Sequence, residues 1–357
     1  MNRKIYNFSA GPAILPQEVL EKAQRELLSF DGIGMSVMEI SHRSKAFADV
    51  LERAESGIRD LLNVPHDYRV LFLQGGASLQ FSMIPMNFLK ARADYIVTGA
   101  WGNKAAKEAR KTGPVNVIHS TEQSGFKTIP SQDEIRFSPD ADYVHYCSNE
   151  TIDGVEFNYD LEGGGIPVVC DASSNILSKP IDIEKYALIY AGAQKNIGPS
   201  GVTLVIIRDD MLGKVPEGQY SMLDYRAIAA NDSMLNTPNT WGIYLVSLVC
   251  DWLGQKGGVA EIARLNARKA QILYDALDSS DGFYRGHADR DARSLMNVTF
   301  RLPSEDLETR FVAEATAAGF NGLKGHRSVG GIRASIYNAF PIEGVERLVE
   351  FMKEFNR

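Results

Sequence analysis

Seven short runs rich in β-branched and aromatic residues recur along the first two thirds of the chain, and most are separated by stretches long enough for a helix. They predict strands at residues 69–73, 95–98, 116–118, 143–147, 167–170, 187–190 and 202–207. Strands joined by segments of crossover length are typical of an α/β domain with a mainly parallel sheet. In such sheets, ligands bind at the carboxyl ends of the strands.

Apolar positions at helical spacing predict helices at residues 17–30, 47–62, 79–89, 241–253 and 308–318. The segment Pro238-Asn-Thr240 supplies a start signal for the helix near Trp241. Between the first two helices, residues 31–44 contain glycines and show no helical period. Segments of this kind often carry function.

A chain of 357 residues exceeds the usual size of one compact core, so we expect two domains. From about Gly257, a long helical stretch leads into strand-like runs at residues 297–300 and 331–337. We therefore predict a large domain at residues 16–256 and a smaller α+β domain at residues 257–357. The N-terminal segment 1–15 is expected to pack near the active site.

Composition and charge exclude several classes of protein. With 38 basic and 45 acidic residues the formal net charge is −7, which argues against a nucleic-acid or membrane-surface partner. No apolar run approaches the roughly 20 residues that a membrane span needs, and the N-terminus lacks a signal-peptide pattern. Cys147, Cys170 and Cys250 are too scattered for a disulfide framework or a zinc site, which favours the cytoplasm. The six histidines show no metal-ligand spacing, so no bound metal is predicted.

Two opposite charges follow neighbouring predicted strands. Asp171 comes directly after the strand at 167–170, and Lys195 lies in a small-residue segment after the next strand. Taken singly, Asp171 reads as a helix cap and Lys195 as a solvated loop residue. Together they provide what pyridoxal 5′-phosphate (PLP) requires, an amine that condenses with its aldehyde and a carboxylate that keeps its ring nitrogen protonated.

The turn Gly75-Gly-Ala-Ser78 follows a strand and opens a predicted helix, so its backbone N–H groups could bind an anion. Glycines at such turns are equally often needed for backbone geometry alone. The turn is neither a Walker loop nor a dinucleotide-binding fingerprint.

Several long motifs resemble those of the phosphoserine aminotransferases, which are class V aminotransferases of the PLP-dependent fold-type I. The similarity extends over almost the whole chain. It rests on Asn7-Phe-Ser-Ala-Gly-Pro-Ala13, Gly34-Met-Ser-Val-Met-Glu-Ile-Ser-His-Arg43, His145-Tyr-Cys-Ser-Asn-Glu-Thr-Ile-Asp-Gly154, Ile189-Tyr-Ala-Gly-Ala-Gln-Lys-Asn-Ile-Gly-Pro199, Thr237-Pro-Asn-Thr240 and residues 320–338.

The resemblance implies a role for each cofactor-binding residue. Lys195 forms the Schiff base with PLP and Asp171 pairs with the pyridinium nitrogen. The other implied contacts are Gly76, Ala77, Ser78 and Gln194 at the phosphate, Trp101 stacked on the ring, and Thr151 near the phenolic oxygen. Some relatives carry Gly-Arg where this chain has Ala77-Ser78, so backbone N–H groups are expected to replace that side chain.

A homodimer is also implied, in which Asn239 and Thr240 reach the cofactor of the neighbouring subunit. From the sequence alone, these two residues are equally explained as an ordinary helix N-cap. Likewise, Trp101 between glycines is more often a core anchor, and Thr151 suits a turn cap.

The implied substrates are 3-phosphohydroxypyruvate with L-glutamate, giving O-phospho-L-serine and 2-oxoglutarate in serine biosynthesis. A strand arginine such as Arg333 can hold the α-carboxylate through two charge-assisted hydrogen bonds. Two His-Arg pairs in loops would bind the phosphate or the distal carboxylate, although single pairs are usually surface residues. They are His42 with Arg43 and His326 with Arg327, while Ser9 would contact the reacting end of the substrate.

Three other functions are compatible with parts of the sequence. An aminotransferase of the serine–glyoxylate type would keep the PLP site, as would a cysteine desulfurase, but the last cysteine, Cys250, lies inside a predicted helix rather than a mobile loop. A non-catalytic PLP-fold protein would be expected to lack Lys195 or Asp171. The sequence does not rank phosphoserine against 4-phosphohydroxy-L-threonine, a substrate of pyridoxine biosynthesis.

Overall fold

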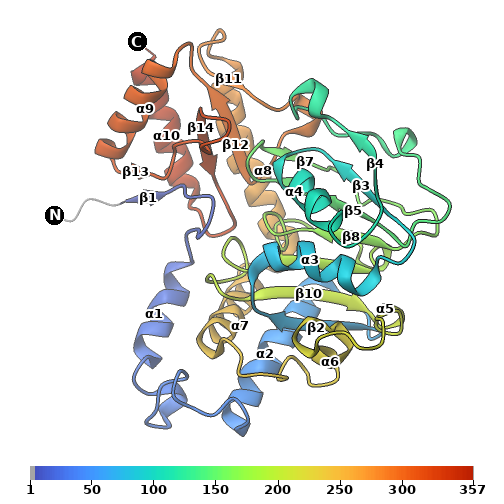
Figure 1. Cartoon of the computed structure of the whole chain (residues 1–357). Helices are drawn as coiled ribbons and strands as arrows, with labels where there is room; N and C mark the ends of the chain where they lie inside the picture. The colour runs from blue at the N-terminus through green and yellow to red at the C-terminus, as the bar shows by residue number, and fades with distance from the viewer. Residues whose placement is uncertain (1–4, 357) are drawn as a thin grey trace.

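The computed structural model describes residues 5–356, so residues 1–4 of the predicted N-terminal segment and Arg357 of the predicted small domain lie outside it. All seven predicted strands enter one sheet, in the order β2-β10-β9-β8-β5-β3-β4 (Figure 1). Their bounds are β2 Tyr68–Leu73, β3 Ala93–Val97, β4 Val115–Ser120, β5 Tyr143–Cys147, β8 Val168–Asp171, β9 Leu188–Gly192 and β10 Thr203–Arg208.

The sheet is mainly parallel, as predicted, with one exception. Strand β10 runs antiparallel to both of its neighbours, β2 and β9. The other pairs, β3 with β4 and β5, β5 with β8, and β8 with β9, are parallel. Strand direction depends on how a connection crosses the sheet, which the apolar pattern of the strand does not encode.

Helices cover both faces of this sheet. Helices α1 (Gln17–Glu26), α2 (Lys45–Leu62) and α7 (Thr240–Gln255) supply buried residues to the core on one face. The core on the other face receives buried residues from four helices. They are α3 (Gly76–Phe88), α4 (Ala100–Ala109), the short α5 (Asp209–Leu212) and the short α6 (Tyr225–Ala229). Along β2, Val70 and Phe72 enter the first core and Leu71 and Leu73 the second. Burial on both faces explains the continuous apolar runs of the strands.

Three predicted helices differ from the structure by three or more residues at one end, and the last of them begins at Glu305 rather than at residue 308. The helix predicted to reach residue 30 ends at Glu26, because the chain turns back on itself and the hydroxyl of Ser29 accepts a hydrogen bond from the Gly34 amide. Helix α3 begins at Gly76, three residues before its predicted start at Leu79. A left-handed Gly75, with φ of 88°, lets the helix begin directly after the strand.

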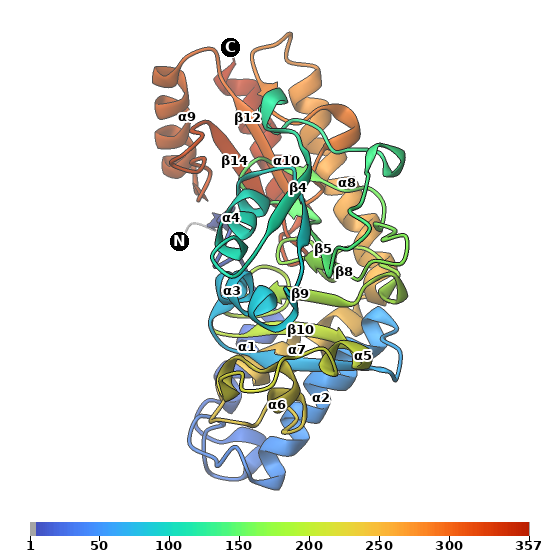
Figure 2. The same ribbon diagram turned by 45° about the vertical axis from the view of Figure 1, so that its right-hand side comes forward.

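The C-terminal part has its own core. Strands β11 (Arg285–Gly286), β12 (Asn297–Arg301) and β14 (Ile332–Ser335) form an antiparallel sheet. Its core also includes residues of α8 (Gly258–Asp278), α9 (Glu305–Ala318) and α10 (Ile342–Phe355). Helix α8 extends from the large sheet to this smaller one (Figure 2), with Ile262 in one core and Leu273 in the other.

The N-terminal segment belongs to the core of the C-terminal part rather than to the large sheet. Strand β1 (Tyr6–Asn7) pairs in parallel with β13 (Phe320–Asn321), and Tyr6 and Phe8 are buried among the C-terminal residues. A small hairpin of β6 (Asn149–Glu150) and β7 (Val155–Glu156) follows β5. Within residues 5–356, no helix is both long and apolar enough to cross a membrane.

Candidate active site

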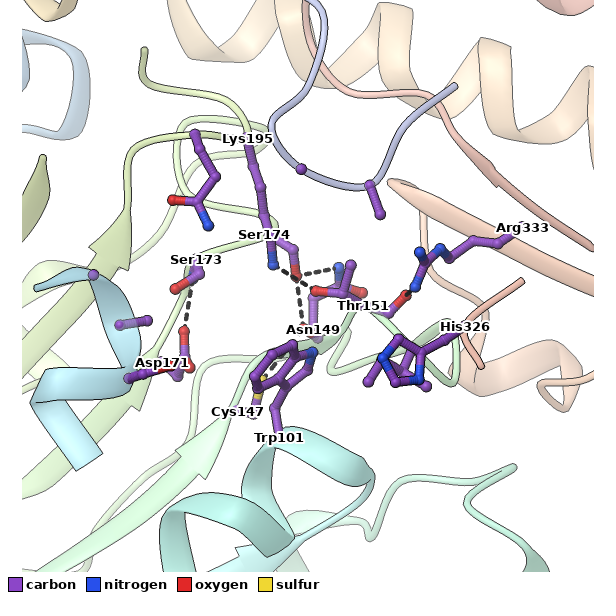
Figure 3. A pocket seen from close by; sticks show the side chains of 17 residues that line it. Trp101, Cys147, Asn149, Thr151, Asp171, Ser173, Ser174, Lys195, His326 and Arg333 are labelled. Carbon is purple, nitrogen blue, oxygen red and sulfur yellow. Dashed lines mark hydrogen bonds between the residues drawn. The ribbon is translucent and has the colours of Figure 1, made fainter. Parts of the chain in front are cut away.

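A cavity of about 300 Å³ lies at the carboxyl ends of β8 and β9, between the large sheet and β14 (Figure 3). Ten of the residues singled out from the sequence line it: Gly76, Ala77, Ser78, Trp101, Thr151, Asp171, Gln194, Lys195, His326 and Arg333. The strand ends, the first turns of α3 and α4, the β6–β7 hairpin and the C-terminal part thus contribute side chains to one space.

Lys195 and Asp171 reach the cavity from adjacent parallel strands. Asp171 is the last residue of β8 rather than the first after it, and Lys195 follows the end of β9. Nζ of Lys195 donates a 2.6 Å hydrogen bond to Oγ1 of Thr151. Burial lowers the pKa of Lys195, and the negative charge of Asp171 opposes that shift. A lowered pKa favours the neutral amine, which is the form that acts as a nucleophile or a base.

Buried polar groups surround Asp171 and form hydrogen bonds with it and with one another. Its Oδ1 accepts a hydrogen bond of 2.9 Å from the Ser173 amide. Burial raises the pKa of Asp171, while hydrogen bonds from Ser173 and Tyr190 lower it. The Tyr190 hydroxyl also lies 2.9 Å from Nε2 of His145, whose pKa burial lowers to about 3, so that this histidine is neutral.

The first turn of α3 lines the cavity, and its backbone N–H groups have no partner within the helix. Its N-cap is Gly75, which provides no side-chain hydrogen bond. A Cβ atom on Gly75 would collide with Leu79, whereas one on Gly76 would meet no atom within 4 Å. The space beside Gly76 is therefore open at the positive end of a helix, which suits a phosphate group.

Arg333 and His326 lie on the side of the cavity opposite the first turn of α3 (Figure 3). Nη1 of Arg333 donates to the Thr151 carbonyl oxygen at 3.3 Å, and its buried Nε has no hydrogen-bond partner among residues 5–356. Burial lowers the pKa of His326, and the nearby charges of Arg333 and Arg327 lower it further. The unpaired guanidinium N–H and the adjacent imidazole can receive an anionic substrate.

Other residues singled out from the sequence lie outside this cavity. Ser9 packs against Gly322, although its neighbours Ala10 and Gly11 line the cavity. Arg327 is exposed and lines a separate surface groove beside α9.

The remaining four lie on the large-sheet side of the chain. His42 and exposed Arg43 precede α2. Asn239 caps α7, accepting a 2.9 Å hydrogen bond from the Gly242 amide, and Thr240 is the first residue of that helix. Within one chain, the two His-Arg pairs are therefore not assembled around the same space.

The structure adds residues that the sequence reasoning did not select. Cys147, Asn149, Ser173 and Ser174 also line the cavity. Asn149 donates to Oγ of Ser174 at 2.7 Å and to Oδ1 of Asn297 at 2.9 Å, which links the hairpin to β12. Cys147 and Asn149 stand in the His145–Gly154 motif, so the signal was present, but the contacts of Asn149 join segments far apart in the sequence.

The arrangement of these groups fits PLP. The cavity offers an amine, a buried carboxylate without a cationic hydrogen-bond partner, an aromatic ring and a helix N-terminus, which match the aldehyde, ring nitrogen, ring face and phosphate of that cofactor. Among residues 5–356, no group of three or more His, Cys, Asp or Glu side chains is placed to hold a metal ion.

Comparisons with known proteins agree with the fold and the cavity. A family model described as aminotransferase class-V matches residues 5–348, so the chain belongs to this family. Within the family, its close relatives are phosphoserine aminotransferases. That of Laribacter hongkongensis is 57% identical over 355 residues, which is 99% of each chain.

Solved structures give the same result. The phosphoserine aminotransferase from Bacillus circulans subsp. alkalophilus is 50% identical, with a TM-score of 0.98 and 99% of both chains covered. A PLP-bound phosphoserine aminotransferase from Trichomonas vaginalis is 41% identical, with a TM-score of 0.93 and coverage of 98% of this chain and 100% of that one.

Proposed function

We propose that this chain is a PLP-dependent transaminase that interconverts 3-phosphohydroxypyruvate and L-glutamate with O-phospho-L-serine and 2-oxoglutarate. The observation that carries the proposal is the convergence of Lys195, Asp171, the first turn of α3 and Arg333 on one cavity. Full-length relatives named phosphoserine aminotransferase support the choice of substrate over a serine–glyoxylate type reaction.

The residues of the cavity have distinct parts in the reaction. When bound, PLP supplies an aldehyde carbon that condenses with amines and a ring that withdraws electrons from the substrate Cα. Asp171 keeps the ring nitrogen protonated, and the N–H groups at Gly76, Ala77 and Ser78 hold the phosphate. Lys195 Nζ takes the proton from the substrate Cα as a general base.

Arg333 orients the substrate. Its Nε–H and a neighbouring Nη–H group bind the α-carboxylate through two parallel hydrogen bonds. This orientation directs the Cα–H bond of the substrate toward Lys195. Because glutamate and the phosphorylated acid differ at their distal ends, one cationic group must accept both a carboxylate and a phosphate. His326 at the cavity and Arg327 next to it in sequence are two members of that group.

We further propose a homodimer in which the partner supplies the rest of the cationic group. His42 and Arg43 lie outside the cavity of their own chain, and the segment before them exposes Leu28, Met35 and Met38 to solvent. Exposed apolar side chains gathered in one segment suit a protein–protein interface. The same arrangement would bring Asn239 and Thr240 to the neighbouring cofactor phosphate. The scattered, free and buried cysteines support a cytoplasmic location.

A cofactor experiment tests the first part of the proposal. The purified protein should absorb visible light at the blue edge of the spectrum, and Lys195→Ala should abolish that band together with transamination. Lys214→Ala, on the opposite end of the sheet beside Asp210, is the control and should keep both. A colourless parent protein that still transaminates would refute PLP dependence.

A substrate panel tests the specificity. Phosphoserine, 4-phosphohydroxy-L-threonine, serine and aspartate are compared in an assay coupled to 2-oxoglutarate. We expect the phosphorylated substrates to exceed serine and aspartate in kcat/KM. Arg327→Ala should reduce phosphoserine turnover far more than that of alanine, and equal losses would contradict its role as a phosphate ligand.

Subunit mixing tests the shared site. Neither Lys195→Ala nor Arg43→Ala alone should be fully active. If Arg43 acts on the neighbouring cavity, dissociating and reassociating the two variants restores one intact site per heterodimer, or about a quarter of parental activity in an equal mixture. If Arg43 acts within its own chain, mixing restores nothing.

A further inference from the structure

Two buried carboxylates from the β6–β7 hairpin hold the first turn of α4. Oε2 of Glu150 accepts a hydrogen bond from the Trp101 amide at 2.9 Å, and Oε1 accepts from the Gly102 amide at 2.7 Å. Oδ2 of Asp153 accepts from the Ala100 amide, also at 2.9 Å. Three N–H groups that the helix itself cannot satisfy are thus bound by residues about 50 positions further along the chain.

The backbone of α4 is shaped to admit these carboxylates. The N-cap residue, Gly99, makes no side-chain hydrogen bond, so a local cap is missing. A Cβ atom at Gly99 would collide with Glu150 and lie 2.6 Å from Oδ2 of Asp153, and one at Gly102 would lie 3.1 Å from Oε1 of Glu150. Both glycines therefore let the carboxylates approach closely enough to replace the cap.

Glu150 occupies this position in spite of its burial. The residue has no exposed surface, and burial together with the charge of Asp153 raises its pKa to about 8. The positive end of the helix and two N–H donors stabilise the ionised form. A serine at the N-cap could satisfy a helix end without burying a carboxyl group, so the arrangement points to a need beyond simple capping.

The residue that this arrangement holds in place is Trp101, whose ring lines the cofactor cavity. The indole Nε1 is buried and has no hydrogen-bond partner within residues 5–356, and Nζ of Lys104 lies 5.0 Å from the centroid of the ring. Its centroid lies 6.0 Å from Lys195 Nζ, and the ring packs in a tilted arrangement against Phe81. Since no hydrogen bond fixes the indole, the backbone that Glu150 holds sets the position from which the ring reaches the cavity.

We propose that Glu150 is a positioning residue that holds Trp101 at the cofactor through its bonds to the Trp101 and Gly102 amides. The inference rests on the proposed function, because it assigns the ring of Trp101 to PLP. Asp153 supports the same turn through a single bond.

Glu150→Gln is the direct test, with Asp153→Asn as its matched control. Glutamine has one acceptor oxygen, so one of the two amides loses its partner and meets the NH₂ group instead. We expect faster deuterium exchange of the peptide that contains Trp101 and Gly102 in the cofactor-free protein. We also expect the dissociation constant of PLP to be about tenfold higher. Asparagine at 153 can keep its single acceptor toward Ala100, so its effects should be smaller.

A double-variant cycle shows whether the effect passes through the ring. In a Trp101→Phe background, Glu150→Gln should weaken PLP binding less than it does in the parent, because the two residues act in series. Additive losses, or parental PLP affinity in Glu150→Gln, would overturn the proposal. Failure of the parent itself to bind PLP would refute the proposed function, whereas the exchange measurement tests the anchoring of α4 independently.

A second variant keeps the test usable if Glu150→Gln does not fold. Gly102→Ala adds a methyl group 3.1 Å from Oε1 of Glu150 without removing the carboxyl group, and alanine favours helix. We expect faster exchange at α4 and weaker PLP binding in this variant as well. Unchanged exchange and unchanged affinity would count against the proposal.

Discussion

Lys195 Nζ lies 2.6 Å from Oγ1 of Thr151, and the same threonine accepts a hydrogen bond at its carbonyl oxygen from Arg333 Nη1 at 3.3 Å. One residue of the β6–β7 connection therefore contacts both the proposed catalytic amine and the proposed carboxylate ligand (Figure 3). Since Lys195 comes from the large sheet and Arg333 from the small one, Thr151 sets the spacing between the two halves of the site.

Thr151→Val should separate these two functions. Valine keeps the shape of the side chain and leaves the backbone carbonyl for Arg333, but removes the acceptor for Lys195. We expect kcat to fall about tenfold, the cost of one hydrogen bond to a charged group, with little change in the KM for glutamate. Thr151→Ser, which retains the hydroxyl, should stay close to the parent in steady-state assays. A rise in KM without loss of kcat would contradict this account.

Asp171→Asn tests the buried carboxylate. The amide has nearly the same size but cannot stabilise a protonated ring nitrogen, so we expect kcat to fall by about 10²-fold or more. PLP should remain bound, since the phosphate and Lys195 contacts are untouched, and absorbance of the bound cofactor can verify this. Asp160→Asn, a partly buried aspartate bonded to the Tyr186 hydroxyl on another edge of the core, is a suitable control. Comparable turnover by the two variants would argue against the role of Asp171.

Arg333→Lys should impair substrate binding while leaving the cofactor in place. Lysine keeps the positive charge but cannot form two parallel hydrogen bonds to a carboxylate. We expect kcat/KM for glutamate to fall about 10- to 100-fold. A similar loss with the phosphorylated substrate is expected, because both substrates share the α-carboxylate. If only one substrate were affected, Arg333 would instead bind a distal group.

Lys269 on α8 predicts a pH dependence of stability. Its Nζ is buried and donates to the carbonyl oxygens of Ile336, Tyr337 and Phe340 at 2.9, 2.7 and 3.2 Å. Burial lowers the pKa of Lys269 to about 7, whereas in the unfolded chain a lysine titrates at about 10.4. Between these values the unfolded state holds a proton that the folded state has lost.

The free energy of unfolding should therefore rise with pH from about 7 toward 10, by at most about 1.4 kcal/mol per pH unit from this residue. Urea denaturation of the parent and of Lys269→Met across that range isolates the contribution. A constant difference between the two proteins would mean that the three carbonyl oxygens keep the ammonium charged throughout.

Local pattern was sufficient for much of this protein. Most of the strands could be read from apolar runs because burial on both sheet faces leaves little room for polar residues, whereas the edge strand β4 is only partly buried. The positions of Asp171 and Lys195 at neighbouring strand ends followed from strand order along the chain, and the motifs pointed to the family.

Long-range contacts decided the rest. The antiparallel direction of β10 depends on the path of its connection, and the hydrogen bonds from α4 to Glu150 join residues that are remote in sequence. The same holds for Thr151 between Lys195 and Arg333, and for the separation of Arg43 from the cavity of its own chain. Sequence alone determined which elements form and which chemical groups stand at their ends, because those depend on neighbouring residues. Only the tertiary structure decided which groups meet, because that depends on how distant segments pack.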